Sequence, residues 1–295
     1  MPTHYSLGLI GYPLGHSLSP ALHQVALQES GLSGSYALFP TPPLPEGQPV
    51  LAELLERLRR DELQGLNVTI PHKQSVLPLL DDLTPAVQSI GAANTLYCDA
   101  GQLVGDNTDA PGFLADLAFL PLTGDKNTIV LGAGGAARAV IYALLQEGWQ
   151  VHIASRRANQ AAALAQALSA SAADGSGCVT ASALDSASLR EVLPICRLIV
   201  NATPVGMSPH TGDNPWPTNL PFPKEACLYD LVYNPAETTL VRAARAAGLP
   251  ARNGLGMLVE QAALAFERWT DQTISRSAML HGIPAMYQPD SRREV

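Results

Sequence analysis

Residues 128–138 read TIVLGAGGAAR, and this stretch decides the fold. An apolar strand leads directly into a glycine-rich turn and then into a helix. In such a turn Gly132 makes the tight bend, Gly134 lets the backbone approach a pyrophosphate, and the small Ala137 lets helix and strand pack closely. The free N–H groups at the start of the helix suit phosphate oxygens. The stretch therefore predicts a Rossmann-type domain that binds a dinucleotide, rather than a plain strand–helix turn.

The end of the next predicted strand, 150–154, indicates which dinucleotide is bound. A site for NAD usually has an acidic side chain at this point, where it holds the ribose 2′-hydroxyl. Here the strand is followed by Ser155, Arg156 and Arg157, with no acid. Guanidinium groups match phosphate well, and these two stand where a 2′-phosphate would lie. We therefore predict NADP rather than NAD, against the alternative of a solvated arginine pair.

Strand and helix patterns alternate along the rest of the chain. The predicted strands are 5–10, 36–39, 65–70, 94–97, 128–131, 150–154, 197–201 and 227–232. The predicted helices are 19–30, 50–61, 136–147, 158–168, 238–247 and 257–269, with a turn at 172–177 before another strand. Alternation with near-continuous apolar strands predicts parallel, doubly wound sheets. We expect an α/β fold of two domains that divide near Pro111.

The composition argues against several classes of function. Of the 295 residues 46% are hydrophobic, and the formal net charge of −8 disfavours a nucleic-acid partner. No apolar run reaches the roughly 20 residues of a membrane span, and the N-terminal residues lack a signal-peptide pattern. No repeat supports a scaffold. The four cysteines have no metal-binding spacing, so we expect no metal, reduced thiols and a cytoplasmic location.

Polar side chains gather at turns and strand ends in the first half of the chain. Ser19 is followed by Pro20, which predicts Ser19 as the N-cap of helix 19–30. Ser17 adds a second hydroxyl near the same helix end, where a carboxylate is favoured. Asn67 and Thr69 share one face of the strand 65–70, because side chains alternate along a strand.

Lys73 follows the end of that strand, where ligands bind in open α/β sheets. A lone lysine is usually a solvated surface charge. Lysine is scarce here, however, because only Lys73, Lys126 and Lys224 occur among the 18 basic residues. Lys126 and Lys224 fall in turn-rich segments and keep the surface interpretation. Lys73 among polar side chains instead indicates a specific use of an ammonium group.

Two further polar turns hold Asn94 and Asp109, which turn chemistry alone would explain. Asp109 is a candidate partner for Lys73, but sequence spacing does not determine that distance. Residues 201–207 follow another strand end and are expected to line the cofactor crevice. Gln261 lies in the last predicted helix among mostly apolar neighbours.

Taken together, eight motifs in order resemble the shikimate dehydrogenase family. They are SLSP (17–20), NVTIPHK (67–73), AANT (92–95), NTD (107–109), GAGGAAR (132–138), NATPVGM (201–207), YDLVYNP (229–235) and GLGMLVEQ (254–261). The resemblance implies a substrate-binding α/β domain made of residues 1–110 and 255–295. A Rossmann-type NADP-binding domain, 111–254, would be inserted into it, with the active site in the cleft between the domains.

The resemblance also implies roles for individual residues. Lys73 and Asp109 would be the catalytic pair. The substrate-binding residues would be Ser17 and Ser19 for a carboxylate, Asn67, Thr69, Asn94 and Gln261 for ring hydroxyls, and Tyr233 to close the site. The cofactor-binding residues would be Gly132, Gly134, Gly135, Ala136, Ser155, Arg156, Arg157, Ala202, Thr203, Pro204, Leu231, Gly254 and Met257.

The implied reaction is the NADP-dependent, reversible reduction of 3-dehydroshikimate to shikimate, in the pathway to the aromatic amino acids. The partner would be this small molecule, and a homodimer is left open. One alternative is a dual quinate/shikimate dehydrogenase. Another is a non-catalytic NADP-sensing relative, which would be expected to lack Lys73.

The sequence departs from the family pattern in two places. The family usually has Asn-Arg-Thr where this chain has Ser155-Arg156-Arg157, so a contact from Arg157 to the 2′-phosphate is left open. It usually has His-Asn where this chain has His23-Gln24. The proline-rich stretches 40–49 and 209–225 predict loops to which we assign no function.

Lys73 has two roles to choose between in this reaction. Lysine is protonated at neutral pH, and an adjacent carboxylate favours the charged form. A protonated Lys73 suits reduction, as the donor of a proton to the carbonyl oxygen. Alternatively it acts as an electrostatic positioner that stabilises the developing alkoxide.

Overall fold

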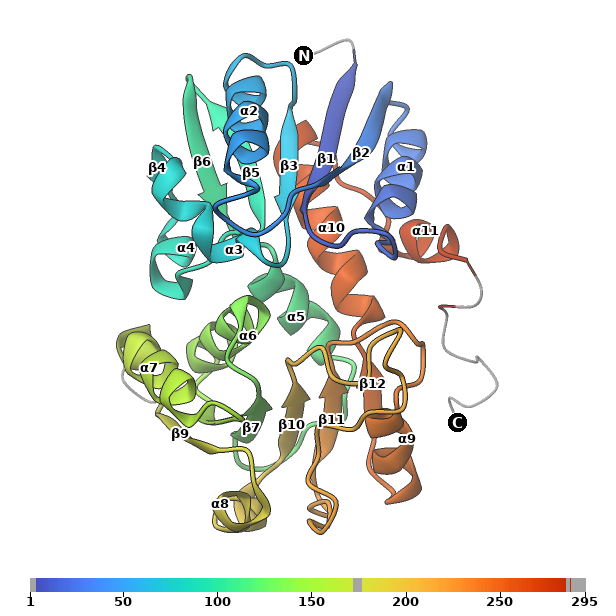
Figure 1. Cartoon of the computed structure of the whole chain (residues 1–295). Helices are drawn as coiled ribbons and strands as arrows, with labels where there is room; N and C mark the ends of the chain where they lie inside the picture. Colours follow the sequence, from blue (N-terminus) through green and yellow to red (C-terminus); the bar gives the residue numbers. More distant parts are fainter. Residues whose placement is uncertain (1–3, 172–176, 285–286, 288–295) are drawn as a thin grey trace. The chain divides into compact units, whose positions relative to one another are not determined.

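The structure is a computed structural model that describes residues 4–171, 177–284 and 287 (Figure 1). Residues 1–3 and most of the turn predicted at 172–177 lie outside the described residues. The chain folds as two compact units, each around its own six-stranded sheet. Unit 1 holds Met1–Gly112 and Val259–Ile283, and unit 2 holds Phe113–Leu258.

The sheet of unit 1 has the strand order β2-β1-β3-β5-β6-β4. Its strands are β1 (Tyr5–Gly11), β2 (Gly34–Pro40), β3 (Gly65–Val68), β4 (Asp82–Leu83), β5 (Thr95–Asp99) and β6 (Gln102–Asp106). The central strand β1 pairs in parallel with β2 and β3, as the alternating pattern predicts. Polar side chains that follow β1 and β3 therefore lie at the same edge of the sheet.

The prediction of an all-parallel sheet is wrong for β5, which runs antiparallel to both β3 and β6. β5 and β6 form a hairpin through the two residues Ala100 and Gly101. Both have positive φ, 48° and 81°, as a two-residue turn of this kind requires. Gly101 accepts that backbone freely, and the dipeptide is the sequence signal for the hairpin.

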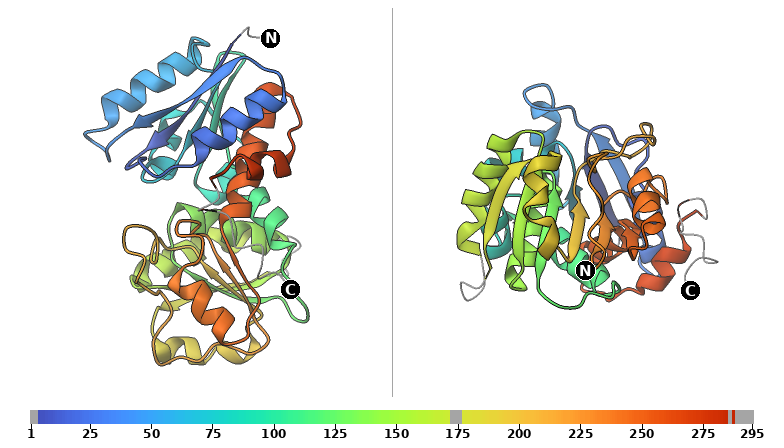
Figure 2. Two further views of the ribbon diagram at one scale, coloured as in Figure 1. Left: turned by 90° about the vertical axis from the view of Figure 1, so that its right-hand side faces the viewer. Right: turned by 90° about the horizontal axis from the view of Figure 1, so that it is seen from below.

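Helices cover both faces of this sheet (Figure 2). They are α1 (Ser19–Glu29), α2 (Gln48–Arg59), α3 (His72–Ser75), α4 (Pro85–Ile90), α11 (Arg276–His281) and the unit 1 part of α10 (Leu255–Thr270). α2 buries its leucines against Ile10, Leu66 and Val68. On β3, Gly65 leaves room for the Trp269 ring of α10, since a Cβ there would come within 2.3 Å of it.

The sheet of unit 2 is entirely parallel, with the order β12-β11-β10-β7-β8-β9. Its strands are β7 (Asn127–Leu131), β8 (Gln150–Ser155), β9 (Val179–Ala183), β10 (Leu198–Asn201), β11 (Cys227–Asp230) and β12 (Ala251–Asn253). This is the order of a Rossmann fold, in which the chain reverses direction across the sheet between β7 and β10. In sheets of this order a dinucleotide binds at the carboxyl ends of these two strands.

Described helices that lie wholly or partly in unit 2 connect or flank these strands. They are α5 (Asp109–Leu117), α6 (Gly135–Gln146), α7 (Ala158–Leu168), α8 (Ser186–Arg190) and α9 (Thr239–Ala246). The predicted helix 158–168 is confirmed to the residue as α7. The division between the units falls inside α5, after Gly112, and inside α10, after Leu258.

None of the described helices is long and apolar enough to cross a lipid bilayer. All four cysteines are free thiols. Within the described ranges, no group of three or more His, Cys, Asp or Glu side chains is arranged to hold a metal ion.

Candidate functional site

Lys73 and Asp109 form an ion pair in unit 1. Lys73 lies in α3 and Asp109 begins α5, and Lys73 Nζ is 2.5 Å from Asp109 Oδ2. The two side chains are only 13% and 6% exposed. The second carboxylate oxygen of Asp109 accepts a hydrogen bond from Asn94 Nδ2 at 2.9 Å. Both oxygens of the Asp109 carboxylate are thus occupied by donors, which fixes its orientation beside Lys73.

Asn94 connects this pair to the rest of the predicted site. Its amide nitrogen also lies 2.9 Å from Thr108 Oγ1 and 3.3 Å from Gln261 Oε1. Its oxygen accepts the backbone N–H of Thr108 at 2.7 Å, which fixes the orientation of the amide. The structure therefore brings together Lys73, Asp109, Asn94 and Gln261. Thr108 is a member of this network that the sequence analysis missed, because NTD also reads as an ordinary turn.

Tyr36 is a second missed residue, and it connects two predicted substrate-binding side chains. Its phenol donates to Asn67 Oδ1 at 2.8 Å, and the Ser19 side chain hydrogen-bonds the same phenol. Asn67 Nδ2 in turn donates to the backbone oxygen of Asn94 at 3.2 Å. Burial raises the pKa of Tyr36, so the phenol stays protonated and able to donate. In the sequence Tyr36 was indistinguishable from an ordinary aromatic strand residue.

The hydroxyls near α1 differ from expectation in one respect. The prediction that Ser19 is the N-cap is wrong, because Leu18 occupies that position and Ser19 is the first helical residue. Leu18 makes no side-chain cap, and the N–H of Ser19 instead donates to Ser17 Oγ at 3.3 Å. Thr69 continues past β3 in extended pairing, since its N–H donates to the Ile10 oxygen at 2.8 Å.

His23 of α1 packs against the aromatic rings of Tyr36 and Trp269. Its ring stacks on Tyr36 at a centroid distance of 4.2 Å and lies 5.4 Å from the ring of Trp269. Burial lowers the pKa of His23 to about 3, and neither ring nitrogen has a hydrogen-bond partner among the described residues. His23 is therefore neutral, and its ring stacks on Tyr36 as an ordinary aromatic side chain would.

In unit 2 the glycine-rich turn has the form that a pyrophosphate requires. Gly132 has a φ of +106°, and a Cβ there would lie 2.9 Å from Thr203 Cγ2. At Gly134, by contrast, an added Cβ would meet nothing within 4 Å, so the backbone faces open space. Gly134 precedes α6 without a side-chain cap, which leaves first-turn N–H groups of Gly135 and Ala136 for an anion. These residues fit a dinucleotide.

The arginines after β8 fit the same ligand. Arg156 and Arg157 are exposed, and among the described residues neither guanidinium has a hydrogen bond or an ion pair. Ser155 is buried, and its Oγ accepts the N–H of Arg157 at 3.3 Å, which orders the turn. Two guanidinium groups at the end of the second strand, without partners in the part of the chain that the structure describes, suit a 2′-phosphate.

The segment after β10 is fixed by its own side chains. Asn201 Oδ1 accepts from both the N–H (3.0 Å) and the Oγ1 (2.7 Å) of Thr203. Asn201 Nδ2 donates to Asp230 Oδ1 at 2.8 Å, and burial raises the pKa of Asp230 to about 6. Ala202, Thr203 and Pro204 are thereby held next to the turn at Gly132.

The remaining predicted site residues also belong to unit 2, namely Leu231, Tyr233, Gly254 and Met257. Gly254 packs against Leu231, because a Cβ would lie 2.1 Å from the Leu231 oxygen. Met257 is buried in the first turn of α10. Tyr233 is therefore in the other unit from the remaining substrate-binding candidates, and its role stays a prediction.

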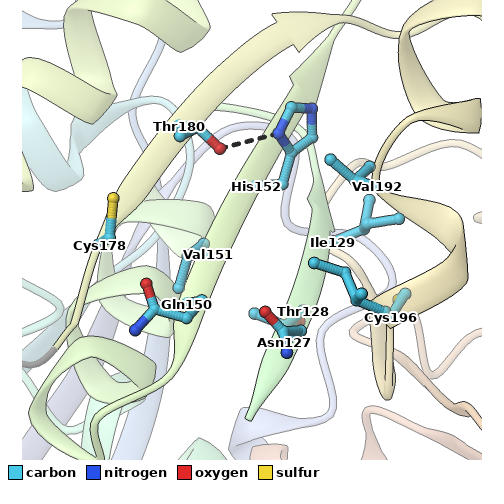
Figure 3. Close-up of a pocket in the computed structure, with 11 residues that line it drawn as sticks. Asn127, Thr128, Ile129, Gln150, Val151, His152, Cys178, Thr180, Val192 and Cys196 are labelled. Atoms are coloured by element: carbon cyan, nitrogen blue, oxygen red, sulfur yellow. Dashed lines mark hydrogen bonds between the residues drawn. The ribbon is translucent and has the colours of Figure 1, made fainter. Parts of the chain in front are cut away.

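Unit 2 also has a cavity of about 240 Å³ between β7, β8 and the segment 192–196 (Figure 3). His152 faces it and hydrogen-bonds Thr180 Oγ1 at 2.9 Å. Asn127 and Gln150, the first residues of their strands, line the same cavity. It therefore lies toward the amino ends of the strands, away from the glycine-rich turn, and we do not assign it to the dinucleotide.

Comparison with known proteins identifies two matching families. A profile described as the shikimate dehydrogenase substrate binding domain matches residues 9–96. A second, described as the shikimate 5'-dehydrogenase C-terminal domain, matches residues 254–281. Together they cover most of unit 1, with all of α11, and residues 254–258 of unit 2, where α10 begins.

Relatives that match nearly the whole length of the chain include proteins named shikimate dehydrogenase. The chain is 42% identical over 284 residues to a protein of Salinibacter ruber named shikimate dehydrogenase (NADP(+)), covering 94% of this chain and 96% of the relative. A crystal structure of shikimate 5-dehydrogenase from Thermus thermophilus in complex with NADP(H) and shikimate is 40% identical, with a TM-score of 0.81 and coverage of 94% and 98%. Quinate dehydrogenase from Corynebacterium glutamicum in complex with NAD is 32% identical, with a TM-score of 0.83 and coverage of 95% and 98%.

Proposed function

We propose that this chain, which belongs to the shikimate dehydrogenase family, catalyses the NADP-dependent, reversible reduction of 3-dehydroshikimate to shikimate. The observation that carries the proposal is the Lys73–Asp109 pair at 2.5 Å, joined through Asn94 to Gln261. Relatives named for this activity and for NADP support it. With this activity the chain serves aromatic amino-acid biosynthesis.

We assign substrate binding and NADP binding to different parts of the chain. Residues 1–110 and 255–295 form the substrate-binding and catalytic domain, and residues 111–254 form the NADP-binding domain. The match of residues 9–96 to a substrate-binding profile supports the first assignment, and the glycine-rich turn supports the second.

The substrate is a hydroxylated ring with a carboxylate. In this proposal the hydroxyls of Ser17 and Ser19 bind the carboxylate near the start of α1, where the helix dipole favours negative charge. Asn67, Thr69, Asn94 and Gln261 bind the ring hydroxyls, and Tyr233 closes the site. The hydrogen bonds of Asn67 and Asn94 fix their amide orientations before substrate arrives, which lowers the entropy cost of binding.

The cofactor is held by unit 2. Gly132, Gly134, Gly135 and Ala136 bind the pyrophosphate, and Ser155, Arg156 and Arg157 surround the 2′-phosphate. Ala202, Thr203, Pro204, Leu231, Gly254 and Met257 line the remainder of its site, with Gly254 and Met257 next to the nicotinamide. When bound, NADP+ would accept the hydride that shikimate loses on oxidation, and NADPH would supply the hydride that reduces the ring ketone.

Lys73 handles the proton at the ring oxygen. One N–H of its ammonium group is directed at Asp109, which leaves two others for the substrate oxygen. In reduction the Lys73 ammonium donates a proton to the carbonyl oxygen and becomes a neutral amine. In oxidation the neutral amine receives the hydroxyl proton and becomes an ammonium. If Lys73 instead acts only as a positive charge beside the alkoxide, the proton exchanges with water, so both roles place Nζ next to the reacting oxygen.

The absorbance band of reduced nicotinamide tests the proposal. Purified protein is mixed with shikimate and NADP+, then with NAD+ in its place, and then with quinate in place of shikimate. We expect the highest kcat/KM with shikimate and NADP+, because Arg156 and Arg157 replace the acid of an NAD site. Comparable rates on quinate would favour the dual enzyme. NADP+ binding without turnover on either substrate would indicate a sensing protein and contradict the proposal.

Two further expectations accompany this function. We infer a cytoplasmic location, which the four free thiols support because disulfides are rare in that reducing compartment. The homodimer stays a prediction, which light scattering of the purified protein checks. A monomer that has full activity at all concentrations would contradict it.

A further inference from the structure

The proposed function leaves unused a buried carboxylate in unit 2, that of Asp116 in the last turn of α5. Its side chain is 3% exposed. The phenol of Tyr229 donates to Asp116 Oδ2 at 2.6 Å, and Arg252 Nη2 donates to Oδ1 at 2.7 Å. Tyr229 and Arg252 are directly opposite each other on β11 and β12. One carboxylate therefore ties α5 to two neighbouring strands.

Stability alone does not explain this arrangement. Burying a carboxylate and a guanidinium has a desolvation cost that is often not recovered, and apolar side chains of similar volume frequently serve as well or better. The three groups do, however, define one geometry, because hydrogen bonds to both carboxylate oxygens are directional. We therefore interpret this fixed geometry as a means of placing a neighbouring segment of the chain.

The neighbouring segment is the turn 254–257 at the start of α10. A Cβ on Gly256 would lie 1.9 Å from Asp116 Oδ1, so the backbone of this turn packs directly on the carboxylate. The backbone N–H of Met257 hydrogen-bonds the phenol of Tyr229. First-turn N–H groups of a helix have no partner within the helix, so Tyr229 satisfies one of them while it donates to Asp116.

We propose that Asp116, acting through Tyr229, positions the turn 254–257 against the nicotinamide half of NADP. The proposal rests on the proposed function, in which Gly254 and Met257 contact that half of the cofactor. Tyr229 accepts from Met257 and donates to Asp116, so it transmits the position of the carboxylate to the turn. Asp116 and Tyr229 are positioning residues and have no contact with reacting atoms in this account.

The test compares two ligands that differ in the nicotinamide. The first is NADP+, and the second is 2′-phospho-ADP-ribose, which keeps the 2′-phosphate and the pyrophosphate but lacks the nicotinamide. Both ligands are titrated calorimetrically into the full-length Tyr229→Phe variant. The substitution should raise the Kd of NADP+ about tenfold, the scale of a lost hydrogen bond to a charged group. The Kd of 2′-phospho-ADP-ribose should stay within about twofold.

Tyr142→Phe is the matched control, because it removes a phenol from α6 in the same unit. It should change neither Kd. If Tyr229→Phe fails to fold, Asp116→Asn takes its place, since it keeps the side-chain volume and removes the charge. A Kd that rises equally for both ligands, or that changes for neither, overturns the proposal. Wild-type protein that does not bind NADP+ at all contradicts the proposed function instead.

Discussion

The two units are prepared for their ligands in opposite ways. In unit 1 the functional groups are side chains that satisfy one another, as in the chain of hydrogen bonds from Lys73 through Asp109 and Asn94 to Gln261. In unit 2 the functional groups are a backbone turn that faces open space at Gly134 and two arginines, Arg156 and Arg157, whose guanidinium groups have no partner among the described residues.

The difference follows from the chemistry that each unit performs. Proton transfer needs one side chain in one orientation, which a connected network supplies. Binding a diphosphate and a 2′-phosphate needs several hydrogen-bond donors, and each donor contributes part of the binding free energy. We therefore expect single changes in unit 1 to be severe, and single changes in unit 2 to be graded.

The largest effect is expected from Lys73→Ala, which removes the proton-handling group from the network. Turnover with shikimate should fall by about 10²–10⁴-fold, the range for a general acid or base. The Kd of NADP+ should be nearly unchanged, because that ligand is held by the other unit. Lys126→Ala is the control, since Lys126 only donates to the Glu147 backbone oxygen. Near-normal turnover of Lys73→Ala would remove Lys73 from the reaction.

A graded effect is expected in unit 2 from Arg156→Ala. The ratio of kcat/KM for NADP+ to that for NAD+ should fall about 10- to 100-fold, as expected for lost charge-assisted hydrogen bonds. Arg157→Ala, measured the same way, should have a smaller effect if Arg157 contributes a surface charge alone. An unchanged ratio in both variants would mean that the 2′-phosphate is bound elsewhere.

Burial of His23, whose ring stacks on Tyr36, should make the free energy of unfolding depend on pH. The pKa of His23 is about 3 in the folded protein and 6.5 as its ordinary value, because burial disfavours the charged form. Between these values the unfolded chain binds more protons, so stability falls as pH falls below 6.5. The loss attributable to His23 is about 2 kcal/mol at pH 5.

The His23→Phe variant keeps a ring for Tyr36 to stack on and should lose this part of the pH dependence. Denaturant unfolding at pH 7 and pH 5 measures it. The exposed His16 supplies the control, since His16→Phe should leave the wild-type difference unchanged. The same loss of stability in His23→Phe as in the wild type would show that another group titrates.

The smallest effect is expected from Tyr36→Phe, which leaves the catalytic pair intact but frees Asn67 and Ser19. KM for shikimate should rise about 3- to 10-fold, with kcat changed less, because one neutral hydrogen bond orients two binding side chains. Steady-state kinetics in both directions check this. A loss of kcat as large as that of Lys73→Ala would place Tyr36 in the reaction itself.

The sequence allowed prediction of the features that depend on local pattern. The glycine-rich turn, the arginines after β8 and the helix at 158–168 are each encoded within a dozen residues, and the structure has them at those positions. The reversal of β5 was missed because its signal is the short Ala100-Gly101 turn in an otherwise parallel pattern.

Two kinds of feature in the site depend on contacts between distant residues: the distance within the predicted Lys73–Asp109 pair, and the residues that were missed. Asp109 is 36 residues from Lys73, and no local pattern reports their 2.5 Å separation. The phenols of Tyr36 and Tyr229 look like ordinary strand aromatics until Asn67 and Asp116 are seen beside them. Ser19 was misplaced by one residue as a cap, which is the usual uncertainty at a helix end.

The most direct test of the central claim is the stoichiometry of the reaction. Purified protein is incubated with shikimate and NADP+, NADPH is measured by its absorbance, and the organic product is identified and measured by chromatography. We predict equal amounts of NADPH and 3-dehydroshikimate, formed only when shikimate is present. NADPH formed without 3-dehydroshikimate, or no NADPH at all from protein that binds both ligands, would contradict the account.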